Sequence, residues 1–421
     1  MEKAFIAYLS GEEDCHKNSV RAKVELPASA YELRDALERA HVQQSAHIDV
    51  EYCGASGFQT LRQVMGGVNT LPDLYALNVL AEKLVSLDVG ETRAFMGMVD
   101  MERQKADAVI PISRLYNLAS GTDICRVLDV ANDAALGRYC VTNGLLTQYA
   151  HWSAAERETL DFEEIGRRVR EDNGGVFLPM GLGYVERCGE VRDAFKDLSL
   201  TLKEPDYAVL MEVKVAGETG DITAMLKLPA TMEEIGAAVY ELEIRTWEET
   251  TLRCVDCRIP ALTSAMSRRG NIMECNRFAQ RIAEIPQGQL VKFKALLAAR
   301  GFDSLEEALD LCGQLDSYIL EADIHTPEDA AKRELNFLLC ESDAKSLLPH
   351  VNLLTYGRQT MAEYHLTITE YGAFGREDGA PLRSPQKRDA PEFGRSGRES
   401  DGAECQKKRT ASVKKERGAT R

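Results

Sequence analysis

The feature of this 421-residue chain that most constrains its fold is an internal repeat. Leu26-Pro27-Ala28-Ser29 precedes Glu32, and Leu228-Pro229-Ala230-Thr231 precedes Glu234 at the same spacing. In both places a Ser or Thr stands three residues before a Glu, which is the pattern of a helix capping box. The hydroxyl and the carboxylate of such a pair satisfy backbone N–H groups that the first helical turn leaves free. The sequence therefore predicts a strand running into a capped helix twice, 202 residues apart.

The correspondence continues through the rest of both halves. Its strongest part sets residues 77–84 against 275–282. Further matches, in chain order, are 115–118 with 308–311, 133–138 with 328–333, Gly166-Arg167 with Gly357-Arg358, and Gly181 with Gly372. The matches are collinear because the offset falls only from 202 to 191. We interpret the chain as two tandem copies of one module, a first copy over 1–196 and a diverged second copy over 206–375.

Each copy is expected to combine a small sheet, a helical middle, and a closing helix with a hairpin. Short apolar runs in the first copy predict strands at 4–9, 21–26 and 48–52, with a capped helix at 30–40. Apolar residues at helical spacing predict five further helices, at 74–84, 89–101, 112–118, 133–141 and 161–171. A Gly-rich turn then separates hairpin strands at 176–178 and 183–185, and the seam between the copies falls at 197–205. The predicted fold class is α+β with several subdomains.

The formal charge of −16 is unevenly distributed. Residues 1–200 carry a net −10, residues 201–375 a net −11, and residues 376–421 a net +5. An acidic body argues against direct binding of DNA by the folded modules and suits a basic partner. The segment 376–421 contains one aromatic residue, Phe393, and is expected to be a disordered basic tail. Its Lys and Arg clusters leave contact with nucleic acid open.

Cysteine usage and hydropathy indicate a cytoplasmic protein. There is no apolar run of transmembrane length and no apolar signal region near Met1, so no membrane association is expected. Eleven cysteines in such a chain are expected to be reduced thiols. Cys254 and Cys257 form a Cys-x-x-Cys pair, but Cys257 falls opposite Cys53 of a predicted strand in the repeat. We therefore expect a packed thiol there rather than a metal ligand.

Residue patterns that support catalysis are sparse. The chain has no phosphate-binding loop, and its seven histidines are dispersed. Carboxylates cluster at 161–172 and at 88–102, where paired acids could perform acid–base chemistry. Acids in the first turn of a helix, however, ordinarily complement the helix dipole. We expect no enzyme, no metal and no cofactor.

Six short motifs follow one another in the first copy. In chain order they are the helix pattern of 77–84, Leu115-Tyr116-Asn117-Leu118, Leu136-Gly137-Arg138-Tyr139, Gly166-Arg167, Gly174-Gly175-Val176-Phe177 and Gly183-Tyr184. Their order resembles that of the ArdA antirestriction proteins of plasmids and conjugative transposons. The resemblance covers most of residues 3–187. It recurs more faintly over 207–375, where Asn276, Ala279, Gly357-Arg358 and Tyr371-Gly372 keep the register.

This resemblance implies an elongated, dimeric protein whose modules have three small subdomains and an acidic surface like that of bent DNA. It implies an inhibitor that occupies the DNA-binding groove of type I restriction–modification enzymes. B-DNA presents one negative charge per about 1.7 Å of axis, so rows of carboxylates suit the same basic groove. The acids expected to form this partner-binding surface are Asp73, Glu82, Asp88, Glu91, Asp133, Glu158, Asp161, Glu163, Glu164 and Glu171.

Several alternatives stay open at this point. The chain is expected to form either a homodimer or an intrachain pseudo-dimer of its two copies. The second copy could instead have diverged into a scaffold, because its predicted helix 265–282 carries Arg268, Arg269, Arg277 and Arg281. The whole chain could be a non-inhibitory interaction scaffold of a mobile genetic element, or a nucleic-acid-associated protein acting through its tail. An enzyme would require a concave pocket with convergent polar groups.

Overall fold

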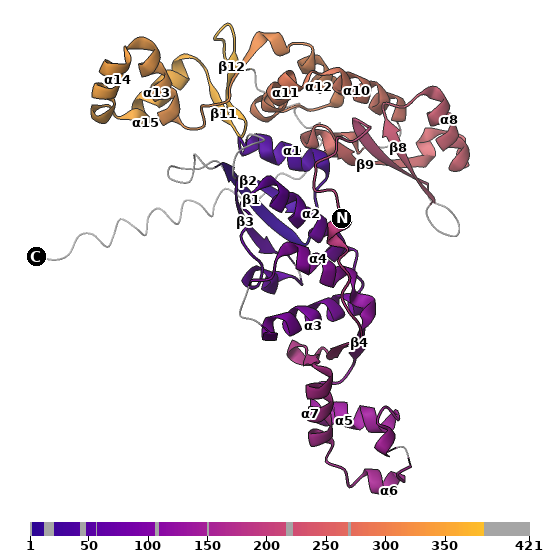
Figure 1. Ribbon diagram of the computed structural model, residues 1–421. Coiled ribbons are helices and arrows are strands. Elements are labelled where there is room, and N and C mark those ends of the chain that lie inside the picture. The colour runs from indigo at the N-terminus through magenta and orange to yellow at the C-terminus, as the bar shows by residue number, and fades with distance from the viewer. Residues whose placement is uncertain are drawn as a thin grey trace, which may run out of the picture. The chain divides into compact units, whose positions relative to one another are not determined.

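The computed structural model describes residues 2–11, 21–42, 48–55, 57–105, 109–149, 151–215, 222–267 and 271–382. These residues belong to one structural unit, in which helices and small antiparallel sheets alternate along the chain (Figure 1). The α+β class with several subdomains is thereby confirmed. Among the described residues, no helix combines the length and the apolar character needed to cross a bilayer.

The first copy opens with a three-stranded antiparallel sheet in the order β2-β1-β3. Its strands are β1 (Phe5–Gly11), β2 (Ala22–Leu26) and β3 (Ile48–Gly54), and helix α1 (Ala30–Arg39) lies between β2 and β3 in the sequence. Side chains in β2 alternate between buried and exposed, as expected of a strand with one face on a core. Leu33 and Ala36 of α1 pack in the same core as Val24 and Leu26. The predicted strands and helix are confirmed.

Both predicted capping boxes are formed. The Ser29 Oγ accepts from the backbone N–H of Glu32 at 3.1 Å, and the Glu32 carboxylate accepts from the N–H of Ser29 at 2.9 Å. Thr231 and Glu234 repeat these two bonds at 3.2 and 2.7 Å. The helix starts are therefore set locally by the same four-residue pattern in each copy.

The helical middle of the first copy packs its apolar stripes into the same core as the sheet. It consists of α2 (Leu71–Val85), α3 (Val89–Lys105) and α4 (Ile112–Ser120). Thr70 caps α2, and Pro72 occupies its first turn. Asn78 fixes α2 to the strand–helix junction, because its side chain accepts from the N–H of Ala28 at 2.7 Å and donates to the Ala28 carbonyl at 3.0 Å.

The first copy closes with three helices and a second small sheet in the order β4-β6-β5. The elements are β4 (Cys125–Leu128), α5 (Asp133–Thr142), α6 (Ala154–Arg157), α7 (Phe162–Asn173), β5 (Val176–Phe177) and β6 (Tyr184–Arg187). The predicted hairpin is confirmed, whereas β4 was missed. Helices α5 and α7 approach so closely that a Cβ on Gly166 would lie 1.8 Å from the carbonyl oxygen of Asp133.

The second copy repeats this order of elements. Its sheets are β8-β7-β9 and β10-β12-β11, matching β2-β1-β3 and β4-β6-β5. Asn276 also repeats the role of Asn78, accepting from the N–H of Ala230 at 2.7 Å and donating to its carbonyl at 2.9 Å. The elements are β7 (Val209–Val215), β8 (Ile222–Leu228), α8 (Met232–Glu241), β9 (Thr250–Cys257), α9 (Thr263–Met266), α10 (Ile272–Glu284), α11 (Gln287–Arg300), α12 (Leu305–Cys312), β10 (Tyr318–Glu321), α13 (Pro327–Leu338), α14 (Glu341–Leu347), α15 (Leu353–Glu363), β11 (Thr367–Thr369) and β12 (Gly372–Arg376).

The strand register corrects the expected match between Cys53 and Cys257. Phe5 pairs with Gly54 in the first copy, and its counterpart Val209 pairs with Cys257 in the second. Cys257 is therefore equivalent to Gly54, and Asp256 takes the place of Cys53. The match from the sequence was wrong by one residue. A bulge in β9, opposite the step from Leu210 to Met211, adds one residue to the strand, whereas the match had added two.

Two later matches need similar corrections. Gly372 is equivalent to Gly183, not to Gly181, because each stands one residue before the first partner of β10 or β4, Ala373 or Tyr184, and their φ angles are 121° and 127°. The β5–β6 loop is two residues longer than its counterpart, which displaced the match. Asn132 and Thr326 cap the equivalent helices α5 and α13, so Asp133 lies opposite Pro327 rather than Glu328.

The two copies contact each other through a buried ionic cluster. Lys294 of α11, only 3% exposed, places its Nζ 2.9 Å from the Asp35 carboxylate and 2.6 Å from the Glu38 carboxylate of α1. The hydroxyl of Tyr371, in the β11–β12 turn, donates to Asp35 at 2.8 Å. Removing any one partner would leave charge without compensation in a buried position.

A second buried carboxylate lies at the other end of this contact. Asp256 of β9 accepts from the Ser29 hydroxyl at 2.6 Å and from the Tyr207 hydroxyl at 2.9 Å. The hydroxyl of Tyr31 donates to the carbonyl of Tyr207. The first copy therefore contributes α1, whereas the second contributes α11, β9 and the β11–β12 turn. The copies meet within one chain through unlike surfaces, which differs from the isologous contact of a two-fold dimer.

The folded chain extends beyond the expected start of the tail at 376. Arg376 ends β12 and pairs with Asp378 at 2.6 Å, and Leu382 packs against the core of the second copy. The remainder of the predicted tail lies outside the described residues, as do Arg268 and Arg269. The predicted single helix 265–282 was wrong, because α9 ends at Met266 and α10 begins only at Ile272.

Candidate functional site

Four of the ten predicted acids have carboxylates available to a partner. Glu82 on α2, Glu158 between α6 and α7, and Glu163 and Glu171 on α7 are exposed. None of the four forms a hydrogen bond or an ion pair through its side chain with the described residues. Their carboxylates are therefore not bonded to a neighbouring side chain, as pairing with an external Lys or Arg requires, although the charge of Glu171 contributes to the raised pKa of Arg170 beside it.

Four other predicted acids serve as helix caps. Asp73 accepts from the Thr70 hydroxyl at 2.7 Å at the start of α2. Asp88 accepts from the N–H of Glu91 at 2.7 Å, and Glu91 accepts in return from the N–H of Asp88 at 2.9 Å. Asp161 accepts from two N–H groups in the first turn of α7, each at 3.1 Å. These positions are explained by helix capping, although an exposed cap still contributes negative charge to the surface.

The last two predicted acids are already paired with arginines. Asp133 receives two bonds from Arg170, at 2.9 and 3.0 Å. Glu164 pairs with Arg168 at 2.8 Å and with Arg167. The same bond to Asp133 raises the pKa of the Arg170 guanidinium. Intramolecular pairing reduces what Asp133 and Glu164 can offer to a basic partner.

The four available acids do not form one cluster. Glu163 and Glu171 stand eight residues apart on α7, which is about 12 Å along a helix axis and roughly one side of it. Glu82 belongs to α2, whose leucines pack in the core of the first sheet, whereas Val169 of α7 packs in a separate core. The structure thus brings together the α7 pair and leaves Glu82 in a different subdomain.

Other exposed acids were missed. The exposure of Asp49 could have been predicted, because it alternates with the buried Ile48 and Val50 in β3. For acids in loops and at helix ends no such periodicity exists. Examples of such exposed acids are Asp172, Glu190, Asp197, Glu241, Glu243 and Glu248.

The second copy carries the opposite charge over its helical middle. Residues 258–300 hold eight Lys and Arg against two Glu. The equivalent residues 55–102 of the first copy hold three Lys and Arg against six Asp and Glu. Of the positive charges, Lys294 is buried against the first copy, whereas Arg277 and Arg281 of α10 are exposed. The acidic helical middle is therefore a property of the first copy and not of the repeat, although residues 201–375 as a whole still carry a net −11.

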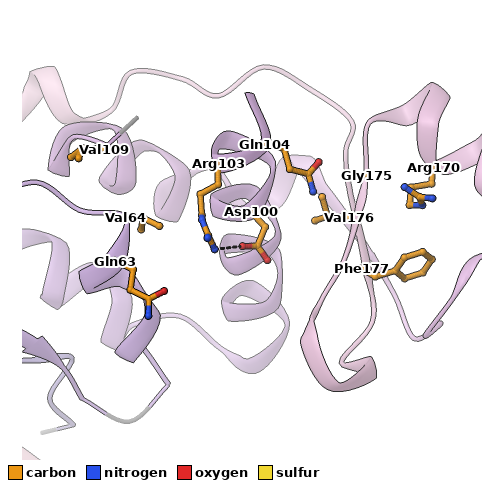
Figure 2. Close-up of a pocket in the computed structure, with 10 residues that line it drawn as sticks. All are labelled: Gln63, Val64, Asp100, Arg103, Gln104, Val109, Arg170, Gly175, Val176 and Phe177. Atoms are coloured by element: carbon orange, nitrogen blue, oxygen red, sulfur yellow. Dashed lines mark ion pairs between the residues drawn. The ribbon is translucent and has the colours of Figure 1, made fainter. Parts of the chain in front are cut away.

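An open hollow of about 480 Å³ lies between α3 and the edge strand β5 (Figure 2). Asp100 and Arg103 face it from α3 and pair at 3.6 Å, and Arg170 lies over the ring of Phe177 on the opposite side. Burial raises the pKa of Asp100. The lining contains no Ser, Thr, Cys, His, Lys or Tyr, and both arginines already pair with carboxylates. It presents no nucleophile and no acid–base pair.

The Cys-x-x-Cys pair is buried in the core of the second copy. Cys254 and Cys257 both pack there, and burial raises the pKa of the Cys257 thiol well above its ordinary value. A buried thiol of raised pKa is a poor source of the thiolate that binds metals. Throughout the described part of the chain, no three His, Cys, Asp or Glu side chains are grouped as a metal site would require.

The exposed acids of the first copy are therefore the candidate site. Comparison with known proteins adds no relative to this description: neither a protein-family model nor a curated protein matches the chain.

Proposed function

We propose that the chain is an antirestriction protein that occupies the DNA-binding groove of a type I restriction–modification enzyme through the acidic surface of its first copy. The observation that carries the proposal is the set of exposed, unpaired carboxylates of Glu82, Glu158, Glu163 and Glu171. The order of motifs that resembles ArdA proteins supports it, as does the net −21 of residues 1–375.

The physical basis is competition for one basic groove. Enzymes that hold duplex DNA line the groove with Lys and Arg, and DNA binding releases condensed counterions. A rigid acidic protein in the same groove gains association rate from long-range attraction. Salt should weaken the inhibition, because the Debye length shortens from about 10 Å at 0.1 M to about 3 Å at 1 M.

The experiment is cleavage of DNA by a purified type I enzyme, titrated with the full-length protein at two salt concentrations. The expected result is inhibition at near-stoichiometric protein that weakens as salt rises. Absence of inhibition at a large excess, across several type I enzymes, would contradict the proposal.

A set of charge-neutralising variants locates the surface. The combined Glu82→Gln, Glu158→Gln, Glu163→Gln and Glu171→Gln protein should inhibit at least about tenfold more weakly, since each lost contact to a cation contributes about 0.5 kcal/mol or more. The matched control removes the same number of charges from the second copy, by the substitutions Glu241→Gln, Glu243→Gln, Glu248→Gln and Asp303→Asn. Equal loss in both proteins would mean that net charge alone, and not the first copy, governs inhibition.

A second candidate function is a non-inhibitory interaction scaffold, and the basic middle of the second copy favours it. Arginines of α7 that pair with acids, such as Arg168 with Glu164 and Arg170 with Asp133 of α5, also give that helix charge of both signs. Deletion of residues 383–421 distinguishes both of these functions from a third, binding of nucleic acid through the tail. Inhibition by the folded modules should survive this deletion, whereas an activity that acts on nucleic acid through the tail should be lost.

A further inference from the structure

We propose that a second copy of this chain docks its helix α8 into a groove on the first copy, formed by α3 and the β5–β6 loop. This contact would repeat between chains the contact that joins the two copies within one chain. The inference rests on the equivalence of the two copies and is independent of the proposed antirestriction function.

The intrachain contact provides the template. Helix α1 of the first copy presents Asp35 and Glu38 to Lys294 of α11 and to Tyr371 of the β11–β12 turn. It also lies against the short turn η8 (Pro260–Leu262), which follows β9. Because the copies have the same order of elements, the first copy must have an equivalent surface, and the second copy an equivalent of α1.

The equivalent surface on the first copy is an apolar groove of about 510 Å³. Phe95 and Phe293 occupy the same buried position of α3 and α11, which places Met96 opposite Lys294. Gly183 is equivalent to Gly372, which places Leu182 opposite Tyr371. Both Met96 and Leu182 line the groove, together with Gly57 and Phe58, which are the counterparts of η8, the exposed Val89 at the start of α3, and the exposed Pro179 and Met180 of the β5–β6 loop. Polar side chains of α3 and the residue before it, those of Asp88, Thr92 and Arg93, complete this side of the groove, and Arg93 is already paired with Asp129 at 2.9 Å.

This groove is unusually exposed for its composition. Val89 is 74% exposed and Met180 is fully exposed, although both side chains are apolar. In the second copy the position of Val89 holds Gln287, whose amide donates to Glu38 at 3.3 Å. Apolar side chains thus stand in the first copy where the second copy has polar groups that hold α1. A concave apolar patch of this kind marks an interaction site.

Helix α8 presents a complementary face. Ser29 and Thr231 are the equivalent caps, so Asp35 corresponds to Ala237 and Glu38 corresponds to Tyr240. Ala237 is exposed, and Tyr240 is 88% exposed, more than any other large apolar side chain described in the second copy. Where α1 carries two carboxylates for Lys294, α8 carries two apolar side chains. The groove has changed in the same sense, since Met96 replaces the lysine.

The change from charged to apolar side chains in the groove matches the same change on α8, and this match identifies α8 as the helix that the groove binds. An acidic helix in the apolar groove would bury carboxylates without partners, which is strongly unfavourable. Helix α8 instead brings Ala237 and Tyr240 against Met96, Val89 and Leu182. A second copy of the chain carries this helix in the correct local setting, with the sheet β8-β7-β9 behind it as β2-β1-β3 stands behind α1.

Contact of this kind is heterologous, because the groove and the helix are different surfaces of one chain. Successive chains therefore associate head to tail, and they form a ring if the rotation closes or a filament if it does not. The contact is apolar and joins two acidic chains. Salt should strengthen it by screening their repulsion, which is opposite to the weakening by salt expected for binding to a basic groove.

The experiment measures self-association of the full-length protein by sedimentation velocity over a range of concentrations and at two salt concentrations. Wild-type protein should form oligomers that increase with concentration and salt. The Ala237→Asp/Tyr240→Glu protein and the Met96→Lys protein should each associate at least about thirtyfold more weakly, the effect of losing a central hot spot. Val89→Lys, at an exposed position, replaces Met96→Lys if the latter unfolds by circular dichroism.

The decisive measurement is a mixture of the two variant proteins. Each variant keeps one wild-type surface, so the unchanged groove of the α8 variant can bind the unchanged α8 of the groove variant. The introduced lysine can also face the two introduced carboxylates, as in the intrachain ionic cluster, and association should return. Phe337→Asp is the matched control, because Phe337 is an exposed apolar residue outside both surfaces, and it should associate as the wild type does. A wild-type protein that stays monomeric, variants that associate normally, or a mixture that does not recover would each overturn the proposal.

Discussion

The two copies of the module share an interior and differ in their surfaces. Asn78 and Asn276 make the same pair of bonds to the strand–helix junction, at distances that agree within 0.1 Å. In contrast, Met96 and Lys294 occupy one equivalent position with opposite chemistry. The buried residues that hold the module together agree between the copies, whereas the exposed residues at equivalent positions differ. The fold is therefore common to both copies, and the chemistry of their surfaces is different.

The same contrast applies to charge. The helical middle is acidic in the first copy and basic in the second, while its buried apolar positions correspond. Surface charge acts over about 10 Å at 0.1 M salt and scarcely affects the packing beneath. Duplication followed by divergence of the surface gives one chain two kinds of interface, and four experiments test this comparison.

The largest effect is expected from Lys294→Met, which puts the residue of the first copy into the second. Asp35 and Glu38 would lose their shared cation in a buried position. The free energy of unfolding should fall by about 3–5 kcal/mol. Urea denaturation followed by circular dichroism measures it, and a loss below about 1 kcal/mol would mean that water reaches the cluster.

The control for Lys294→Met is a complete exchange of the cluster. The combined Asp35→Ala, Glu38→Tyr, Lys294→Met and Tyr371→Leu protein carries the residues of the apolar counterpart. It should recover most of the stability lost by the single variant, because apolar replacement of a buried ionic cluster is often neutral or favourable. Further destabilisation would show that the two surfaces are not equivalent in shape.

A smaller effect separates Asn276 from Asn78. Each Asn→Ala variant leaves one N–H and one carbonyl of the junction without a partner. Asn276 is buried and Asn78 is half-buried, so water can replace the lost bonds more readily in the first copy. We expect losses of about 3 kcal/mol for Asn276→Ala and about 1–2 kcal/mol for Asn78→Ala. Equal losses in thermal unfolding would indicate equal access of water.

The two capping boxes should also differ in their contribution. Thr231→Ala removes a helix cap and should cost about 1 kcal/mol. Ser29→Ala removes a cap and also the bond to the buried Asp256 carboxylate, so it should cost about 2–3 kcal/mol. Chemical denaturation of both variants measures the difference. If the Ser29→Ala protein is as stable as the Thr231→Ala protein, the bond from Ser29 to Asp256 contributes no measurable free energy to folding.

The smallest effect concerns His41, which lies where the copies meet. Its ring centroid is 3.9 Å from that of His325, and the two rings are tilted by 50°. Burial and the neighbouring His325 lower the pKa of His41 from 6.5 to about 4. The unfolded chain therefore binds more protons between these two pH values, so stability falls as the pH drops from 6.5 to 4. The loss is on the order of 1 kcal/mol for this half-buried group.

Substitution of His41 tests this pH dependence. His41→Asn suits the left-handed φ of 53° at this position and removes the titrating group. Stability of the variant between pH 4 and 6.5, measured by urea denaturation, should depend less steeply on pH than that of the wild type. An unchanged slope would assign the dependence to other groups.

Short-range patterns in the sequence predicted most of the elements. Ser29 with Glu32, and Thr231 with Glu234, fixed the starts of α1 and α8 within four residues of chain. Helical spacing predicted α2 through Leu74, Leu77 and Leu84. Strand β4 was missed because it is four residues long, includes Arg126, and depends on pairing with β6 about 60 residues later.

The candidate site was predictable only in part. The sequence shows that Glu163 and Asp161 lie at one helix start, but both are acids in a first turn, and nothing local distinguishes them. The structure assigns Asp161 to the cap and leaves Glu163 exposed without a partner among the described residues. Asp133 likewise reads as an acid available for binding until Arg170, 37 residues away, is seen to pair with it.

By itself, the sequence determined the repeat, the capped helices and the alternation of small sheets with helices, because the interactions that define them lie within a few residues or follow a fixed period. Only the tertiary structure decided that Lys294 is buried against Asp35, that Asp256 replaces Cys53, and which acids stay free. The burial of Lys294 depends on atoms more than 200 residues apart that meet through packing, and the pairing of Asp133 depends on Arg170, 37 residues away. Neither burial nor the choice of an ionic partner is encoded locally.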